Sequence, residues 1–166
     1  MLLANVAVGL AQLVIAILFA VLALYIGFAM LGKITHSFNE EKELARGNVA
    51  VGIVVAAVFV AIAVVVESGV SGISVGINKA IEVGVFTPDG LLVVAAAFIQ
   101  LLLGVVLAIG AIYLALTLLE KLTKNVREFE ELRKGNVAVA LEMAGVIIAV
   151  AVIIQSGVLG ITAAII

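Results

Sequence analysis

Among the polar side chains that interrupt the apolar stretches of this sequence, five could carry chemistry. They are Glu67, Glu142, Gln155, Ser68 and Ser156. Carboxylates inside hydrophobic segments mark proton and ion pathways, and rings of acidic side chains select cations in channels. An ionisable group at the centre of a bilayer costs about 2.5–3.5 kcal/mol, so it usually faces a bundle interior or a water path. We therefore treat these five residues as candidate pore or ion contacts.

The depth of Glu142 decides between two interpretations of that residue. The last apolar stretch and its continuation to Ile166 would form roughly 45 Å of helix, which is longer than a hydrocarbon core of about 30 Å. If the core starts at Asn136, Glu142 is buried in it. If the core starts near Glu142, that glutamate is interfacial, and Glu67 and Gln155 lie deep.

No set of residues typical of catalysis is present. The sequence lacks a His-Glu-x-x-His pair, a P-loop and a dinucleotide-binding glycine motif. It has no cysteine, and its single histidine, His36, falls in a charged loop rather than near Ser68 or Ser156. We expect a protein that is not an enzyme, with no catalytic residues, no metal site and no cofactor.

The elements that hold these side chains are predicted to be transmembrane helices. Hydrophobic residues make up 66% of the chain and charged residues only 12%, whereas about a quarter of an ordinary soluble domain is charged. Strands of a membrane barrel would alternate polar and apolar residues, which the apolar stretches here do not. The sequence therefore predicts an all-α membrane protein. Four stretches reach the roughly 20 residues that a spanning helix needs: about 2–32, 48–77, 91–120 and 136–166.

The chain is an internal duplication with an offset of 88 residues. The segment Gly-Asn-Val-Ala-Val at 47–51 recurs at 135–139, and Ser-Gly-Val at 68–70 recurs at 156–158. Each copy contains two spans, so the second copy must enter the membrane in the same direction as the first. We predict two parallel tandem repeats of a helical hairpin. Repeat 1 covers residues 1–78, an external linker covers 79–90, and repeat 2 covers 91–166.

The distribution of positive charge gives the orientation. Every Lys and Arg except Lys79 lies between the first and second spans or between the third and fourth. The positive-inside rule puts both of these loops in the cytoplasm. Both termini and the linker at 79–90 are then outside. The charge in the inner loops is mixed, as in a solvated helical hairpin, and lacks the positive excess of a nucleic-acid surface.

A glycine and an asparagine lie at the start of the second span and again at the start of the fourth. Gly47 and Gly135 supply permissive turns. Asn48 and Asn136 follow them and either cap the outgoing helices or line a polar vestibule. Further along, one helix side in each copy has almost no bulk, which favours close helix packing in lipid. The alternative is a narrow polar lining, with Glu67 and Gln155 forming a ring between subunits. These small residues are Gly69, Gly72 and Gly76 in repeat 1 and Gly157 and Gly160 in repeat 2.

One motif points to a family. The pattern Glu-Leu-x-x-Gly-Asn-x-Ala-x-Ala/Gly occurs at Glu43–Gly52 and again at Glu131–Ala140. A charged inner helix followed by this motif, twice in one small protein, resembles the bacterial and archaeal membrane family called domain of unknown function 350. The resemblance covers essentially the whole chain. It implies a prokaryotic plasma-membrane protein with duplicated helical hairpins and no established activity.

Two functions are compatible with these features. The first is a homo-oligomeric channel or transport module for ions or small solutes, because the duplicated spans combine small-residue faces with a few carboxylates and amides. The second is a non-conducting scaffold or accessory subunit, because the charge-balanced hairpins could dock a cytoplasmic protein partner. The expected partners are thus the lipid bilayer, further copies of the chain and a cytoplasmic protein, but no nucleic acid.

Overall fold

Four long helices and two short ones form the protein in the computed structural model, which describes residues 2–34, 39–123 and 126–165. No strand occurs among these residues. Four of the helices are long and apolar enough to cross a membrane, which confirms the predicted all-α class with four potential spans. The helices are α1 (Leu2–Ile34), α2 (Glu40–Ala45), α3 (Val49–Val83), α4 (Pro88–Leu122), α5 (Glu128–Arg133) and α6 (Val137–Ile165).

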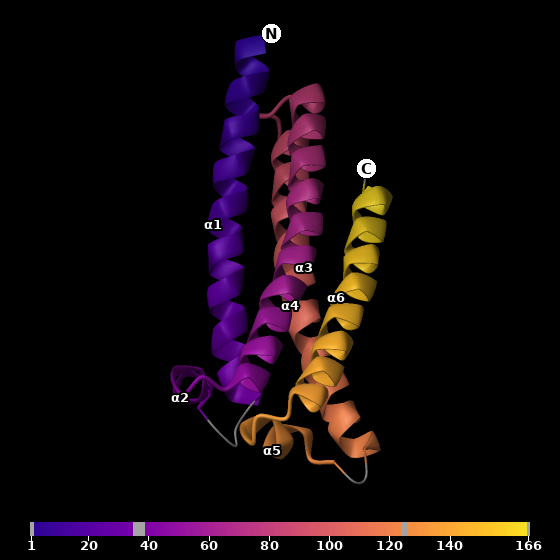
Figure 1. Ribbon diagram of the computed structural model, residues 1–166. Helices are drawn as coiled ribbons and strands as arrows, with labels where there is room; N and C mark the ends of the chain where they lie inside the picture. Colours follow the sequence, from indigo (N-terminus) through magenta and orange to yellow (C-terminus); the bar gives the residue numbers. More distant parts are fainter. Residues whose placement is uncertain (1, 35–38, 124–125, 166) are drawn as a thin grey trace.

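The central helix of the bundle is α3. It packs against α1, α4 and α6, and α4 also packs against α6. As Figure 1 shows, α1 and α4 run in one direction, α3 and α6 run in the other, and α2 and α5 lie at the same end of the bundle. The two short helices begin and end 88 residues apart, as the duplication requires. The two hairpin turns, which contain α2 and α5, therefore lie at the same end of the bundle (Figure 1).

Small and β-branched side chains form the core. The α3 residues that are at most 4% exposed include Ala50, Val54, Ala57, Ala61 and Val65. Their short side chains let neighbouring helices come close, which is how helices associate in lipid.

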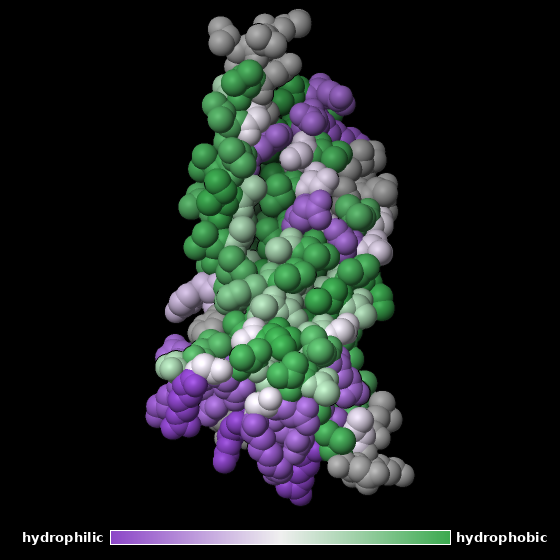
Figure 2. Space-filling view, in the orientation of Figure 1, coloured by the Kyte–Doolittle hydropathy of each residue, from purple (hydrophilic) through white to green (hydrophobic). Residues whose placement is uncertain are grey.

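Most of the outer surface of the bundle is apolar (Figure 2). Figure 2 shows this surface above a hydrophilic end that is formed by α2 and α5. Such a surface is compatible with acyl chains or with another apolar protein face. On α1 the side chains that are more than half exposed include Leu10, Leu13, Ile17, Leu18 and Val21.

The connection between α3 and α4 is shorter than the predicted linker at 79–90. α3 continues to Val83 and α4 starts at Pro88. Gly84 ends α3 with a φ of 98°, a conformation that favours glycine. Thr87 caps α4 by accepting a hydrogen bond from Gly90 N at 3.1 Å, and Pro88 fits the first turn because it needs no donor there. Residues 79–83 remain helical because nothing before Gly84 interrupts the helix.

The connections from α1 to α3 and from α4 to α6 each contain a short helix. α2 and α5 are separate six-residue helices. Asn39 starts α2 by accepting a hydrogen bond from Lys42 N at 3.0 Å. Gly47 and Gly135 then turn the chain with φ values of 77° and 84°. His36 lies outside the described residues.

The glycines of the two copies have different surroundings. A Cβ added to Gly69 would lie 2.1 Å from Leu101 Cδ1, and one added to Gly76 would lie 2.8 Å from Ala97 Cβ. Gly72 is buried on the same helix. These contacts hold α3 against α4. In repeat 2, a Cβ on Gly157 or Gly160 would meet no atom within 4 Å.

We expect Gly69→Val to lower the free energy of unfolding by about 1–3 kcal/mol, because the added carbons must displace Leu101 from a packed contact. Chemical unfolding in detergent micelles measures the change. The control is Gly110→Val, since a Cβ at Gly110 meets nothing within 4 Å. Equal stability of the two variants would show that the α3–α4 contact is not tight.

Candidate functional site

In repeat 1, the glutamate and the asparagine of the Glu-Leu-x-x-Gly-Asn motif are hydrogen-bonded to each other. Asn48 Nδ2 donates to Glu43 Oε2 at 3.1 Å, and Asn48 Oδ1 accepts from Val51 N at 3.3 Å. The asparagine thus caps α3 and also holds the carboxylate of the preceding short helix. Gly47 turns the chain between them.

Repeat 2 builds the same turn. Asn136 Nδ2 donates to Glu131 Oε2 at 3.0 Å, and Asn136 Oδ1 accepts from Ala138 N at 3.1 Å and from Val139 N at 3.4 Å. Hydrogen bonds from Lys134 and then Asn136 lower the pKa of Glu131. A carboxylate that accepts such bonds stays ionised, which suits its role in the turn.

Asn48 also joins the two copies. Its Nδ2 lies 3.2 Å from the carbonyl oxygen of Leu132 and 3.3 Å from that of Arg133. Both carbonyls belong to the last turn of α5, where a helix leaves its carbonyls without internal partners. The amide therefore stabilises the end of a helix in the other copy as well as the turn in its own copy.

Two buried glutamates occupy equivalent positions in the short helices. Glu40 begins α2 and is 8% exposed, and Glu128 begins α5 and is 1% exposed. In each, one buried carboxylate oxygen has no hydrogen-bond partner within the described chain: Glu40 Oε1 and Glu128 Oε2. Burial is the main cause that raises the pKa of both carboxyls, against a lowering effect of backbone hydrogen bonds.

The surroundings of Glu128 favour its protonated form. Thr123 Oγ1 contacts Glu128 Oε1 and lies 2.7 Å from the carbonyl oxygen of Leu119. The carboxylates of Glu120 and Glu142 raise the pKa of Glu128 further by repulsion.

Sequence reasoning missed this pair of glutamates. They looked like ordinary charges in solvated loops, because burial here depends on how a six-residue helix folds over the end of the bundle. The available signal was their spacing, since Glu40 and Glu128 are 88 residues apart and keep the same identity in both copies.

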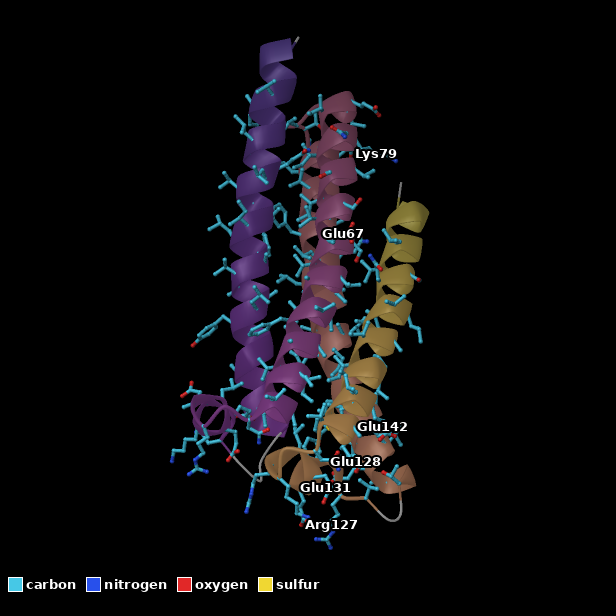
Figure 3. The ribbon with its side chains drawn as sticks, in the orientation of Figure 1. Glu67, Lys79, Arg127, Glu128, Glu131 and Glu142 are labelled. Atoms are coloured by element: carbon cyan, nitrogen blue, oxygen red, sulfur yellow. The ribbon has the colours of Figure 1, made fainter. Side chains whose placement is uncertain are left out.

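Glu142 lies at the charged end of the bundle. It is an exposed residue in the second turn of α6, and Figure 3 places it beside Glu128, far along the bundle from Glu67. Of the two depths considered from the sequence, this arrangement agrees with a glutamate near the hairpin end. Glu142 and Glu67 do not form one site within a single chain.

Glu67 and Gln155 meet on the surface between α3 and α6. Gln155 Nε2 donates to Glu67 Oε2 at 3.2 Å, and Glu67 is exposed. The two residues stand at equivalent positions of the repeats. The serines that follow them bond to their own helices, Ser68 Oγ to Val65 O at 2.8 Å and Ser156 Oγ to Val152 O at 3.1 Å.

The interior of the bundle is mostly apolar, and the buried amide of Gln100 donates to the carbonyl oxygen of Val158 at 3.0 Å. A pocket of about 70 Å³ lies between α1, α3 and α4 and is lined only by apolar side chains. Among the residues that the structure describes, no three His, Asp or Glu side chains gather in a way that could hold a metal ion. Apart from Gln100 and Ser68, whose side chains bond to helix carbonyls, the candidate polar groups lie on the surface of the bundle or at its hairpin end. The pocket is lined by Phe19, Leu22, Ala23, Ile26, Val66, Leu101, Leu102, Val105, Val106 and Ile109.

The comparison with protein families agrees with this duplicated structure. The family described as Domain of Unknown Function (DUF350) matches residues 3–104 and again residues 93–166. The chain belongs to the DUF350 family. The resemblance seen in the Gly-Asn motif is thereby confirmed, and the double match is consistent with a duplicated DUF350 domain. No curated protein and no solved structure matches the chain.

We expect Glu128→Gln to stabilise this DUF350 protein near neutral pH. Because folding raises the pKa of Glu128 above its ordinary value of 4.5, the folded state binds the proton more tightly than the unfolded state. The fold therefore gains stability as pH falls through the raised pKa toward the ordinary one. Glutamine resembles the neutral form and should remove that gain.

Thermal unfolding in detergent between about pH 5 and about pH 8 checks the sign of this effect. Each kcal/mol gained should raise the midpoint by about 2–4 °C. Glu130→Gln is the control, because the Glu130 side chain is 54% exposed. A Glu128→Gln variant that is less stable near neutral pH, with an unchanged pH dependence, would contradict the protonated form.

The two asparagines of the DUF350 motif should differ in their contribution to stability. Asn136→Ala removes a cap, which costs about 0.5–2 kcal/mol. Asn48→Ala removes a cap and the bonds to Leu132 and Arg133, and each net hydrogen bond adds about 0.5–1.5 kcal/mol. Chemical unfolding of both variants measures the difference. If the two costs are equal, the Asn48 link between the copies contributes nothing.

Proposed function

We propose that this DUF350 protein is a non-enzymatic, multi-pass membrane protein whose copies assemble into a channel or transport module for protons or small cations. The observation that supports it most is the Glu67–Gln155 pair on the surface of the bundle. An ionisable side chain that faced acyl chains would cost about 2.5–3.5 kcal/mol. A surface that keeps such a group is better explained by a water path or by another protein.

The level of Glu67 in the bundle supports this assignment. Gly69, which is two residues from Glu67, lies against Leu101. Leu101 stands inside the apolar run 91–119 of α4, about 15 Å from one end of the run and about 27 Å from the other. A hydrocarbon core of about 30 Å within that run therefore encloses the level of Leu101. Glu67 then belongs to the membrane interior, and Glu142 to the interface near the hairpins.

The path is proposed to form between copies rather than inside one chain. Ser68 is 2% exposed and bonds to its own helix, and the pocket beside α1 is apolar. Glu67 and Gln155, in contrast, are directed to the outside of the bundle. Several copies around a common axis would bring these pairs together as a polar ring, the arrangement by which acidic side chains select cations.

The proposed topology follows from the same features. We infer two parallel repeats in a prokaryotic plasma membrane, with both termini outside and both hairpin turns cytoplasmic. The shared direction of α1 and α4 in Figure 1 supports the parallel arrangement. The basic residues Lys42, Arg46, Arg127, Arg133 and Lys134 lie in or next to α2 and α5 (Figure 1), at the end of the bundle opposite Lys79 in Figure 3, and this supports the orientation.

The surface of the hairpin end favours a second candidate function. Exposed ion pairs join Arg127 to Glu130 at 2.9 Å and Lys134 to Glu131 at 2.7 Å. This charge-balanced surface is compatible with docking of a cytoplasmic protein. A non-conducting scaffold would use this surface and would leave Glu67 without a role.

Flux through proteoliposomes tests the channel. We expect the purified protein to pass protons or monovalent cations, and Glu67→Gln to reduce this flux by about tenfold, which corresponds to about 1.4 kcal/mol at the barrier. Glu142→Gln should change the pH dependence of flux, because the Glu142 carboxylate lies at the hairpin end of the bundle, where ions would enter or leave the proposed path. The control is Glu130→Gln, on the exposed surface of α5. Absence of flux, or a Glu67→Gln variant with the original flux, would remove the channel and favour the scaffold.

A further inference from the structure

The two copies use corresponding helices, but their packing is not reciprocal. α3 of repeat 1 packs closely against α4 of repeat 2. The counterparts of these helices are α6 and α1, which lie on opposite sides of the bundle in Figure 1. The chain therefore makes the α3–α4 contact once. The equivalent faces of α6 and α1 do not meet within one chain.

On α4, one stripe of residues makes the internal contact. Ala97, Leu101 and Val105 follow at intervals of four and are 7%, 1% and 9% exposed. Leu101 fits against Gly69 of α3, and Ala97 fits against Gly76. Small residues on α3 thus receive the side chains of α4.

The counterpart stripe on α1 is open. Gly9, Leu13 and Ile17 stand 88 residues before the three residues of the α4 stripe. Leu13 is 55% exposed, Ile17 is 53% exposed, and a Cβ on Gly9 would meet nothing within 4 Å. The residue types are conserved between the stripes in size and apolar character, but their environments differ.

The counterpart face on α6 is open as well. Ile153 is 70% exposed, whereas the equivalent Val65 is 2% exposed. Gly157 corresponds to Gly69, and no atom lies within 4 Å of a Cβ built on it. The surface that receives α4 in repeat 1 therefore has no occupant in repeat 2.

A polar contact at the hairpin end is likewise made by repeat 1 and not by the equivalent residue of repeat 2 among the described residues. Asn48 donates to the last carbonyls of α5, those of Leu132 and Arg133. Asn136 bonds to Glu131 but reaches no corresponding helix end among the described residues. The carbonyls equivalent to those of Leu132 and Arg133 belong to Leu44 and Ala45, at the end of α2.

We propose that α6 of one copy binds α1 of the next by repeating the contact between α3 and α4. Gly157 then receives Leu13 of the neighbouring copy, and Asn136 Nδ2 donates to the carbonyls of Leu44 and Ala45 at the end of the neighbour's α2. This interface continues the one between the repeats. It is heterologous, so it extends from copy to copy and closes into a ring when the rotation permits.

This inference deepens the proposed homo-oligomer, on which it rests, and does not require that the assembly conduct ions. One buried apolar residue of α3 has a charged counterpart on α6. Val54 is buried at 2%, whereas its counterpart Glu142 is exposed.

Disulfide crosslinking in native membranes tests this contact, since the chain has no cysteine of its own. A Cβ on Gly69 would lie 3.3 Å from Leu101 Cβ, close to the distance of about 3.5–4.5 Å in a disulfide. Gly69→Cys with Leu101→Cys should therefore crosslink within one chain. Leu13→Cys with Gly157→Cys should give a ladder of dimers and larger species under the same oxidant.

Two controls keep the result specific. Val14→Cys with Gly157→Cys should give no ladder, because Val14 points away from the Leu13 stripe by one residue, about 100° around the helix. Each single-cysteine variant should stay monomeric, because the contact joins different residues. Asn136→Ala should reduce the ladder of the Leu13 and Gly157 pair.

A monomer alone from the Leu13 and Gly157 pair, with the Gly69 and Leu101 pair crosslinked, would overturn the proposal. So would an efficient dimer from Leu13→Cys by itself, which would indicate a two-fold contact. A ladder without ion flux keeps this interface and removes the channel. Flux without a ladder keeps the channel and removes this interface.

Discussion

The close approach of α3 to α4 is the contact on which the rest of the structure depends. Lipid offers no hydrophobic force to press one apolar helix against another, so helices associate through van der Waals contact and a few hydrogen bonds. Gly69 and Gly76 permit that contact by leaving space for Leu101 and Ala97. Because α3 also packs against α1 and α6, its position sets the place of every other long helix.

Hydrogen bonds fix the hairpin end of this arrangement. Asn48 caps α3, holds Glu43 and satisfies carbonyls at the end of α5. The duplicated sequence supplies an equal asparagine at Asn136, but its environment offers only the local bonds. The copies therefore share a design for the turn and differ in what surrounds it. The buried glutamates Glu40 and Glu128 lie beside these turns, and each is the first residue of a short helix.

The sequence allowed the helical class, the four potential spans and the duplication to be predicted, because each depends on local composition and on comparison of the chain with itself. The ends of the helices were less accessible. The predicted linker began at residue 79, yet α3 continues to Val83 because a helix outside the apolar run needs no apolar side chains. Burial of Glu128 depends on tertiary placement, which no pattern within six residues of α5 contains. Likewise, Gly69 and Gly157 have the same neighbours in sequence and different neighbours in space.

The four-residue connection between α3 and α4, 84–87, has a consequence for how the proposed assembly would respond to the amount of protein in a cell. A short covalent link gives its two ends an effective concentration in the millimolar range or above. The α3–α4 contact is thus made in every folded chain, whatever the expression level. The equivalent contact between α6 and α1 of separate copies has no such link, so it would form according to mass action in the membrane. The same type of contact would then stabilise every folded chain, and between copies it would form to an extent that depends on the concentration of the protein in the membrane.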